Sequence, residues 1–338
     1  MKKYLLPKDG QFYKANLHCH TTCSDGKHTA AEIKEIYQKE GYSIVAFTDH
    51  SVLVPHQDVT DENFLALNGC ELECNQKGTI DWRLMKTCHV CCIALEPDNI
   101  YQVCYADKYL SPYQLERKHI LAFDKERPDF ERVYSHEGRS AMIQEARNRG
   151  FFVTYNHPGT NLEHYPDYIG YKNMNAIELH NTAGVRDGFY DYCPETYDDL
   201  LRAGNKIYAI AGDDTHAADW CFDKQVRGYT MIKAAKLEYR AVTNALVNGH
   251  FYVSQGPVID ELWFEDGVIH LKTPGADRIV FTVGNRRDYK SYIAKDGVSI
   301  KEAEFEIKPD QSYVRATIYD EYGHAANTNA FFIEDLLK

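Results

Sequence analysis

The chain has 338 residues, a formal net charge of −12, and ordinary globular proportions of apolar (44%) and charged (26%) residues. Such an acidic protein is unsuited to gripping long duplex nucleic acid with a broad basic face, although a local cationic pocket is compatible with it. No apolar run approaches the ~20 residues that a membrane-spanning helix needs, and residues 1–9 lack the apolar core of a signal peptide. We therefore expect a cytoplasmic protein whose ten cysteines are thiols.

Apolar runs alternate with helical patterns over the first three quarters of the chain. Strand-type runs lie at 12–17, 43–47, 64–69, 87–95, 151–155, 175–180, 206–211 and 227–233. Helical patterns lie at 29–42, 137–149, 194–203 and 237–248. Strands separated by helices, with polar side chains at their C-terminal ends, indicate a parallel α/β barrel whose site lies at that rim.

Two segments fall outside this alternation. Residues 97–135 are polar, aromatic and charged, with a short helix expected at 112–121, and an insertion of this length usually covers a site or a flank. After residue 256, short alternating runs joined by Asp-Gly, Pro-Gly and Gly-Asn turns predict a small antiparallel β module. We therefore divide the chain into a barrel at 1–255 and a β-rich domain at 256–338.

The first strand run leads into a His-x-His pair. Side chains alternate along a strand, so His18 and His20 face one way and Cys19 the other. Two such imidazoles can hold one cation of the zinc or manganese type, and Asp25, in the Ser-Asp-Gly turn that follows, can add a carboxylate. A surface strand that happens to carry two histidines would look the same, so the pair needs support from the rest of the chain.

Ligand-type side chains recur at the ends of other strand runs, and His89, early in its own run, is the exception to this placement. Imidazole suits borderline metals, and a carboxylate can bridge two of them. At three ligands per ion, the collected set would support three ions. The set is His18, His20, Asp25, His50, Glu71, His89, His157, Asp213 and His216.

These residues resemble the motifs of the PHP (polymerase and histidinol phosphatase) superfamily of metal-dependent phosphoesterases, of the stand-alone type. The matching segments, which lie within 12–255, are His18-x-His20 with Ser24-Asp25-Gly26, Thr48-Asp49-His50, Gly69-Cys70-Glu71, His89, Asn156-His157-Pro158 and Gly212-Asp213-Asp214-Thr215-His216. The resemblance implies a distorted (β/α)7 barrel with a trinuclear centre. It implies one ion on His18, His20, Glu71 and Asp213, a second on Glu71, His89 and His157, and a third on Asp25, His50 and His216.

The expected activity is hydrolysis of a small phosphomonoester, of the nucleotide or sugar phosphate type, or of a short oligonucleotide end. Three manganese, zinc or iron ions would supply a bridging hydroxide and neutralise the phosphate. The leaving group could take its proton from His216, His180 or a metal-bound water. Arg186 could bind a phosphate, with Arg139 a weaker candidate. We expect Asp49 and Asp214 to orient neighbouring ligands or cap helices.

Three other interpretations stay open from the sequence. The same centre could hydrolyse a non-phosphate ester or an amide. The barrel could bind metal without turnover while the C-terminal β module recruits a partner protein. Finally, Cys70, Cys74, Cys88 and Cys91 have a spacing loosely compatible with a zinc–thiolate site, although buried thiols within strands are common.

Overall fold

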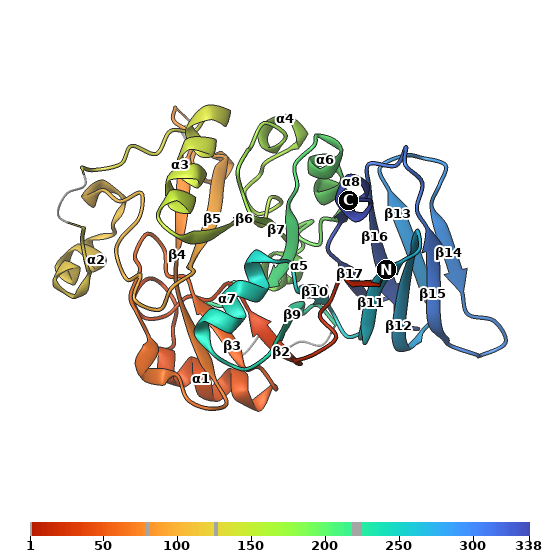
Figure 1. Cartoon of the computed structure of the whole chain (residues 1–338). Helices are drawn as coiled ribbons and strands as arrows, with labels where there is room; N and C mark the ends of the chain where they lie inside the picture. The colour runs from red at the N-terminus through yellow and green to blue at the C-terminus, as the bar shows by residue number, and fades with distance from the viewer. Residues whose placement is uncertain (1, 79–80, 125–127, 218–224) are drawn as a thin grey trace.

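The structure is a computed structural model that describes residues 2–78, 81–124, 128–217 and 225–338. A mixed α/β part holds most of the helices, and a β-rich part built from the last quarter of the chain lies beside it (Figure 1). Both chain ends lie at or near the β-rich part. In the described residues, no helix is both long and apolar enough to span a bilayer.

One large sheet runs through the molecule. Its strand order is β14-β13-β16-β17-β10-β9-β2-β3-β4-β5-β6-β7-β8. The strands of its α/β part are β2 (Gln11–Asn16), β3 (Ile44–Phe47), β4 (Leu65–Asn75), β5 (Thr87–Ala94), β6 (Phe151–Asn156), β7 (Ala176–Asn181), β8 (Tyr208–Gly212), β9 (Tyr229–Ala234) and β10 (Phe251–Ser254). Strands β2 to β9 match the predicted runs, although β4 continues six residues beyond its run, and β10 was not among the predicted strands.

The sheet is mixed, which differs from the parallel barrel that the alternation predicts. Neighbours pair in parallel at β2–β3, β3–β4, β6–β7 and β7–β8, but β5 pairs antiparallel with both β4 and β6. Only residues 76–86 connect β4 to β5, too few for a crossover helix, so β5 has to run back along β4. The N-terminal end of β5 therefore lies at the same sheet edge as the C-terminal ends of its parallel neighbours.

The two ends of the β2-to-β8 run come together through few contacts. A single parallel bridge joins Cys19, beyond the end of β2, to Thr215, beyond the end of β8. The main chain of Ala211 in β8 also exchanges hydrogen bonds with the Thr230 hydroxyl of β9. The described strands thus approach one another here without a continuous ladder, and full closure of a barrel stays a prediction.

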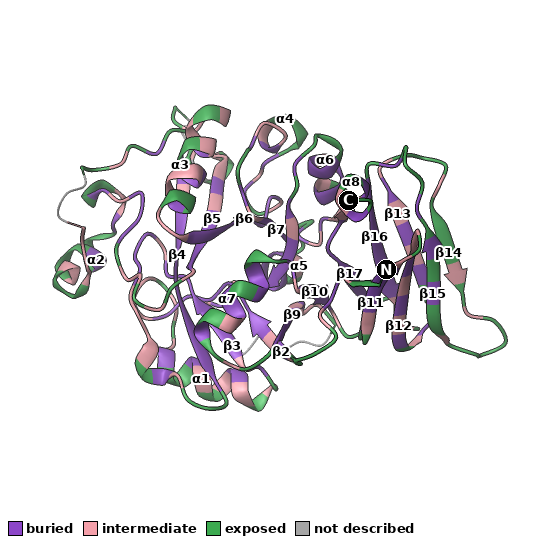
Figure 2. Cartoon of the chain, viewed as in Figure 1, coloured by how far each residue is buried: buried purple, intermediate pink, exposed green. Residues whose placement is uncertain are grey.

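Helices accompany the strands in the described residues. They are α1 (Ala30–Lys39), α2 (Pro112–Glu116), α3 (His136–Asn148), α4 (Tyr165–Tyr168), α5 (Thr182–Arg186), α6 (Pro194–Arg202), α7 (Tyr239–Val247) and α8 (Ile333–Leu336). Helix α1 begins at a capping box between Thr29 and Glu32 and buries Ile33 and Tyr37. Figure 2 shows the same division in α1, α3 and α7, each buried on one side and exposed on the other.

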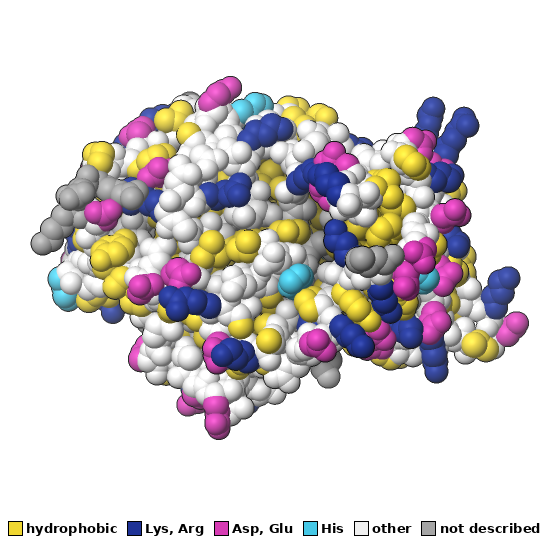
Figure 3. All heavy atoms as spheres, in the orientation of Figure 1, with side chains coloured by type: hydrophobic (Ala, Val, Ile, Leu, Met, Phe, Trp, Pro, Cys, Tyr) yellow, Lys and Arg dark blue, Asp and Glu magenta, His cyan; other side chains and the backbone are white. Residues whose placement is uncertain are grey.

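The β-rich part continues the large sheet and adds a second one. Its strands are β11 (Glu261–Glu265), β12 (Val268–Ala276), β13 (Arg278–Val283), β14 (Lys290–Ile293), β15 (Ile300–Glu306), β16 (Tyr313–Tyr319), β17 (Ala325–Thr328) and β18 (Phe331–Phe332). Strand β17 pairs with β10, and the second sheet has the order β1-β11-β12-β15, with β1 (Lys3–Tyr4) from the chain start. The division at residue 255 stays a prediction, and β1 pairs across it. Acidic and basic side chains intermingle over this part in Figure 3.

Candidate metal centre

The His-x-His segment lies between two other chain segments at one edge of the large sheet. Main-chain hydrogen bonds join it to the turn after β8, from Asp214 to the His18 carbonyl (3.0 Å) and from His20 to the Thr215 carbonyl (3.0 Å). On its other side, the Thr48 amide donates to the Cys19 carbonyl (2.8 Å). This pairing aligns His18 and His20 on one face, with their Nε2 atoms 3.2 Å apart, while Cys19 packs in a hydrophobic cluster with Ile33.

Glu71, in the middle of β4, is the centre of the cluster. It is fully buried, and its carboxylate contacts five imidazoles. The distances from its oxygens are 3.3 Å to His18, 3.4 Å to His20, 2.9 Å to His50, 2.9 Å to His89 and 3.1 Å to His157. A carboxylate in this position can bridge cations held by different histidines.

His89 reaches this cluster because β5 is antiparallel. Its position early in β5 corresponds to the edge where the parallel strands end, and its register partners are Glu73 and Asn156. The irregular place of His89 in its apolar run is therefore a consequence of strand direction.

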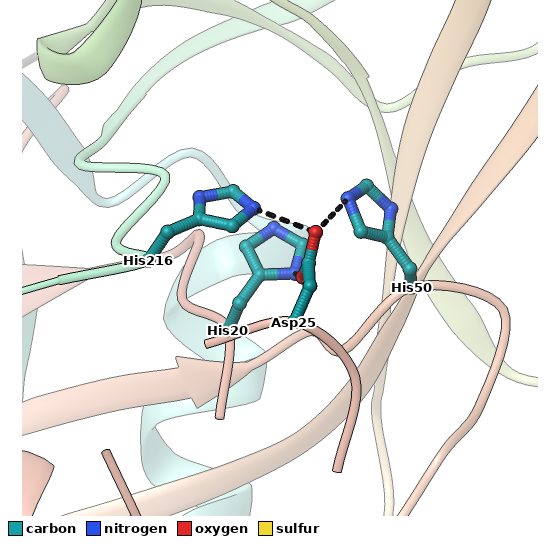
Figure 4. A group of neighbouring side chains, drawn as sticks. All are labelled: His20, Asp25, His50 and His216. Atoms are coloured by element: carbon teal, nitrogen blue, oxygen red, sulfur yellow. Dashed lines mark ion pairs between the residues drawn. The ribbon is translucent and has the colours of Figure 1, made fainter. Parts of the chain in front are cut away.

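A second group lies on the solvent side of the cluster. Figure 4 shows His20, Asp25, His50 and His216 converging, with Asp25 between the rings of His50 and His216. Asp25 Oδ2 lies 3.7 Å from His50 Nε2 and 3.4 Å from His216 Nε2. Asp25 is half exposed, so this side of the cluster is open to a ligand from solution.

The structure differs from the sequence prediction at Asp213. The Asp213 carboxylate turns away from the cluster and accepts hydrogen bonds from Thr182 (2.6 Å) and Tyr37 (3.0 Å). Asp214 takes the predicted place, with Oδ1 3.1 Å from His20 Nε2 and 3.4 Å from His18 Nε2. Asp214 has φ +54°, so the chain is not extended at this point, and its side chain turns towards His18 and His20 while that of Asp213 turns away.

The donor set fits a group of divalent cations. Five buried polar atoms of the cluster make no well-formed hydrogen bond, although some of them are in ion-pair contact: His20 Nδ1, His50 Nδ1, Glu71 Oε2, His157 Nδ1 and Asp214 Oδ1. Buried polar atoms are normally satisfied, and several orphans in one place indicate a missing partner. The atoms are imidazole nitrogens and carboxylate oxygens, the ligands that zinc, manganese and iron share.

The electrostatics of the cluster also favour added positive charge. Burial alone raises a carboxyl pKa, yet the surrounding histidines hold the pKa of Glu71 and of Asp214 well below the usual range. Burial lowers the pKa of a histidine, but Glu71 and Asp25 raise that of His50 to about 10, and Glu71 raises that of His157 to about 9.

A second layer of side chains orients the cluster. Glu178 in β7 lies 3.1 Å from His18 Nδ1, so it can fix the tautomer that leaves Nε2 free for a cation. Its other oxygen accepts from the His157 amide, at a residue whose φ is +26°. Asp49 accepts from the Thr21 amide and the Ser24 hydroxyl, which shapes the turn before Asp25. The sequence prediction did not assign Glu178 a role.

The predicted catalytic side chains differ in their burial and in their bonding partners. His216 belongs to the solvent-side group, and its side chain is partly exposed. His180 is fully buried, donates from Nε2 to the Val226 carbonyl (2.7 Å), and has its pKa lowered to about 4 by burial. The β7–β8 register shifts between Glu178 and His180, and His180 belongs to none of the described ligand groups. Arg186 pairs with Asp187 (2.6 Å), and Arg139 pairs with Glu163 (2.7 Å).

The four cysteines of the zinc–thiolate interpretation do not gather in the described structure. Three of them pack in the hydrophobic cluster that also contains residues of α3: Cys70 and Cys74 in β4, and Cys88 in β5. Cys74 lies opposite Cys88 in the strand pair. Cys91 lies opposite Glu71, on the face of the metal-ligand candidates. Residues 88 and 91 are three apart, so they point to opposite faces of the sheet.

Comparisons with known proteins add structural similarities. No family model and no curated protein matches the chain. A solved two-domain protein from Bacteroides vulgatus, described as containing a predicted PHP-like metal-dependent phosphoesterase, is 15% identical with a TM-score of 0.45, and the match covers 98% of both chains. A provisionally assigned metal-dependent phosphoesterase from Bifidobacterium adolescentis is 14% identical (TM-score 0.39), covering 63% of this chain and 90% of its own.

A third similar structure is an amidohydrolase from Chromobacterium violaceum with bound sulfate and no metal. It is 16% identical with a TM-score of 0.38, and the match covers 60% of this chain and 87% of that one. Because the three TM-scores are 0.45 or lower, these similarities do not support an assignment of the site. The interpretation of the site therefore depends on its geometry.

Proposed function

We propose that the protein is a PHP-type metal-dependent phosphoesterase that hydrolyses a small phosphomonoester. The observation that carries the proposal is the set of five buried atoms without a well-formed hydrogen bond within one cluster of imidazoles and carboxylates. A cluster that served only the fold would satisfy these atoms internally. In this proposal, the β2-to-β8 strands form the distorted (β/α)7 barrel and residues 256–338 form a separate β module.

The ligand candidates divide into three groups, the first two of which share Glu71. His18, His20, Glu71 and Asp214 would hold one ion, Glu71, His89 and His157 a second, and Asp25, His50 and His216 a third. The proposal replaces Asp213 of the sequence prediction with Asp214. Bound divalent ions would supply an activated water and neutralise the charge of the phosphoryl group.

The chain's own residues give the site its dependence on metal. Asp25, Glu71 and Asp214 place three carboxylates around the position where a phosphate would bind. Without cations, these carboxylates would repel a phosphate dianion, so binding and hydrolysis both require a loaded centre. The half-exposed Asp25 and partly exposed His216 leave an approach from solvent for a small substrate or a short oligonucleotide end.

Of the predicted proton donors, we propose a water at the loaded centre over both histidines. His216 would hold the third ion beside Asp25, so its Nε2 would carry no proton to donate. His180 is buried, with Nε2 committed to a main-chain carbonyl. Arg186 already pairs with Asp187, so a phosphate role would require that pair to open.

The test is a hydrolysis screen of the protein loaded in turn with manganese, zinc and iron. The panel contains nucleotides, sugar phosphates and short oligonucleotides, beside a parallel panel of carboxylic esters and amides. We expect phosphate release with at least one metal, and its loss in the Glu71→Gln variant. Turnover confined to the esters or amides would contradict the phosphoesterase assignment, and metal binding with no turnover on either panel would favour a non-catalytic role.

A further inference from the structure

A second group of potential ligands lies just outside the candidate metal centre. Cys23, Asp49 and His56 each offer an atom within 4.8 Å of the others. They come from three segments: the turn after the His-x-His pair, the end of β3, and the loop before the short helical turn at Gln57–Val59. Asp49 is buried, while Cys23 and His56 are partly exposed, so an ion could enter from solvent.

These three ligands differ in chemistry from the main cluster. Thiolate, imidazole and carboxylate together form a typical zinc set, and each of the three residues can supply one. Bond lengths of about 2.0 to 2.3 Å in a tetrahedral site put ligand atoms roughly 3.3 to 3.8 Å apart, so small side-chain rotations would bring them into place. In the described groups of the main centre, every ligand is a histidine or a carboxylate.

The His56 ring has a buried nitrogen that lacks a partner. Its Nε2 makes no hydrogen bond and is out of contact with solvent. The ring packs edge-on against Phe47, with centroids 4.8 Å apart, which restricts its orientation. An unsatisfied buried nitrogen costs free energy that an ion bound in the group would recover.

Asp49 is held in place by the neighbouring turn. Its Oδ1 accepts from the Thr21 amide (2.8 Å) and the Ser24 hydroxyl (2.7 Å), and its Oδ2 accepts from the Thr21 hydroxyl (2.8 Å). A carboxylate oxygen has two lone pairs, so Oδ2 keeps one for a cation. The turn therefore fixes the Asp49 carboxylate within 4.8 Å of the ligand atoms of Cys23 and His56.

We infer that Cys23, Asp49 and His56 form a separate site for one thiophilic divalent ion of the zinc class. The site shares no ligand with the main cluster, so it stands whether or not that cluster is a phosphoesterase centre. Since Asp49 also holds the turn that leads to Asp25, an ion at this site would stiffen one wall of the main cluster. The fourth coordination position would be open to water.

Cobalt substitution tests the site because a thiolate gives cobalt a near-ultraviolet charge-transfer band that imidazole and carboxylate ligands do not. We expect the full-length protein loaded with Co²⁺ to show this band, and the Cys23→Ser variant to lose it. The His56→Gln variant should weaken the band and lower the affinity for Co²⁺. Cys91→Ser is the matched control, since Cys91 faces the main cluster and the band should survive its removal.

Zinc content gives a second measurement. The Cys23→Ser variant should bind one zinc ion fewer per chain than the unmodified protein, with the visible cobalt bands of the main cluster unchanged as a check on folding. A wild-type protein without the charge-transfer band, or a band that survives in Cys23→Ser, would overturn the inference. A band lost in Cys91→Ser would assign the thiolate to the main cluster and overturn it as well.

Discussion

Two buried glutamates of this protein have opposite surroundings. Glu71 contacts five imidazoles, and its cluster leaves five polar atoms without a well-formed hydrogen bond. Glu163 accepts from Arg139 (2.7 Å), Tyr134 (2.8 Å) and Tyr155 (2.7 Å), and also from the Tyr171 hydroxyl. Arg139 also stacks over the Tyr134 and Tyr171 rings.

The difference separates a binding site from a structural network. Glu163 satisfies both oxygens with donors that keep their protons, and burial raises its pKa. Glu71 is surrounded by nitrogens that can exchange a proton for a metal ion, and those histidines hold its pKa well below the usual range. A buried carboxylate therefore indicates a metal site only when its partners can give up protons, and the following predictions test this difference.

The largest effect on stability is expected at Glu163. Glu163→Ala would leave the Arg139 cation buried without its carboxylate, which costs about 3–5 kcal/mol of unfolding free energy. Urea denaturation followed by circular dichroism measures the loss. The metal content of the folded protein should be unchanged, and a fall in bound metal would mean that the two clusters are coupled.

Glu71→Gln tests the other side of the comparison. The substitution keeps the side-chain shape but removes the charge and one acceptor oxygen, so we expect metal affinity and any metal-dependent turnover to fall by about 100-fold or more. Metal titration by calorimetry measures the affinity. Glu163→Gln is the matched control, and full metal affinity in Glu71→Gln would contradict the central position of Glu71.

The adjacent acids in the turn after β8 provide a matched pair. Asp214→Asn removes a carboxylate that contacts His18 and His20, and should weaken metal binding by about tenfold or more. Asp213→Asn should leave metal affinity within about twofold, because Asp213 bonds to Thr182 and Tyr37 instead. Equal losses in the two variants, measured in one titration series, would show that the assignment of the acids is wrong.

The smallest effect is expected where the insertion touches the cluster. Gln114 in α2 is buried and donates to the His50 carbonyl (2.7 Å). Gln114→Ala should cost about 1 kcal/mol, the usual net contribution of one hydrogen bond, and change metal affinity little. The same urea experiment measures it. A loss of metal binding as large as that of Glu71→Gln would place the insertion within the metal-binding machinery.

Much of the candidate site could be predicted from residue type and position in the sequence. The His-x-His pair predicts two imidazoles on one face because alternation along an extended chain is a local property. His50, Glu71, His157 and His216 follow strand-type runs or lie in them, so their convergence at one sheet edge also follows from the alternation of strands and helices. Helix α1 was predicted from the helical spacing of its apolar residues, of which the structure buries Ile33 and Tyr37.

Three assignments depended on backbone geometry that the pattern does not contain. The choice between Asp213 and Asp214 depends on a residue with φ +54° and on pairing with a segment almost two hundred residues away. His180 lies outside the cluster because its ring bonds to the Val226 carbonyl, a partner 46 residues away. Strand direction brings His89 to the cluster, and a short connection sets that direction.

By itself, the sequence determined which side chains are available for metal binding and which runs of residues carry them, because residue chemistry and alternation act over a few neighbouring positions. Only the tertiary structure decided which of these side chains meet, and which buried charges are already neutralised within the fold. Glu71 and Glu163 are the same residue type, and no local pattern distinguishes them. Their partners come from distant segments, and packing alone brings those segments together.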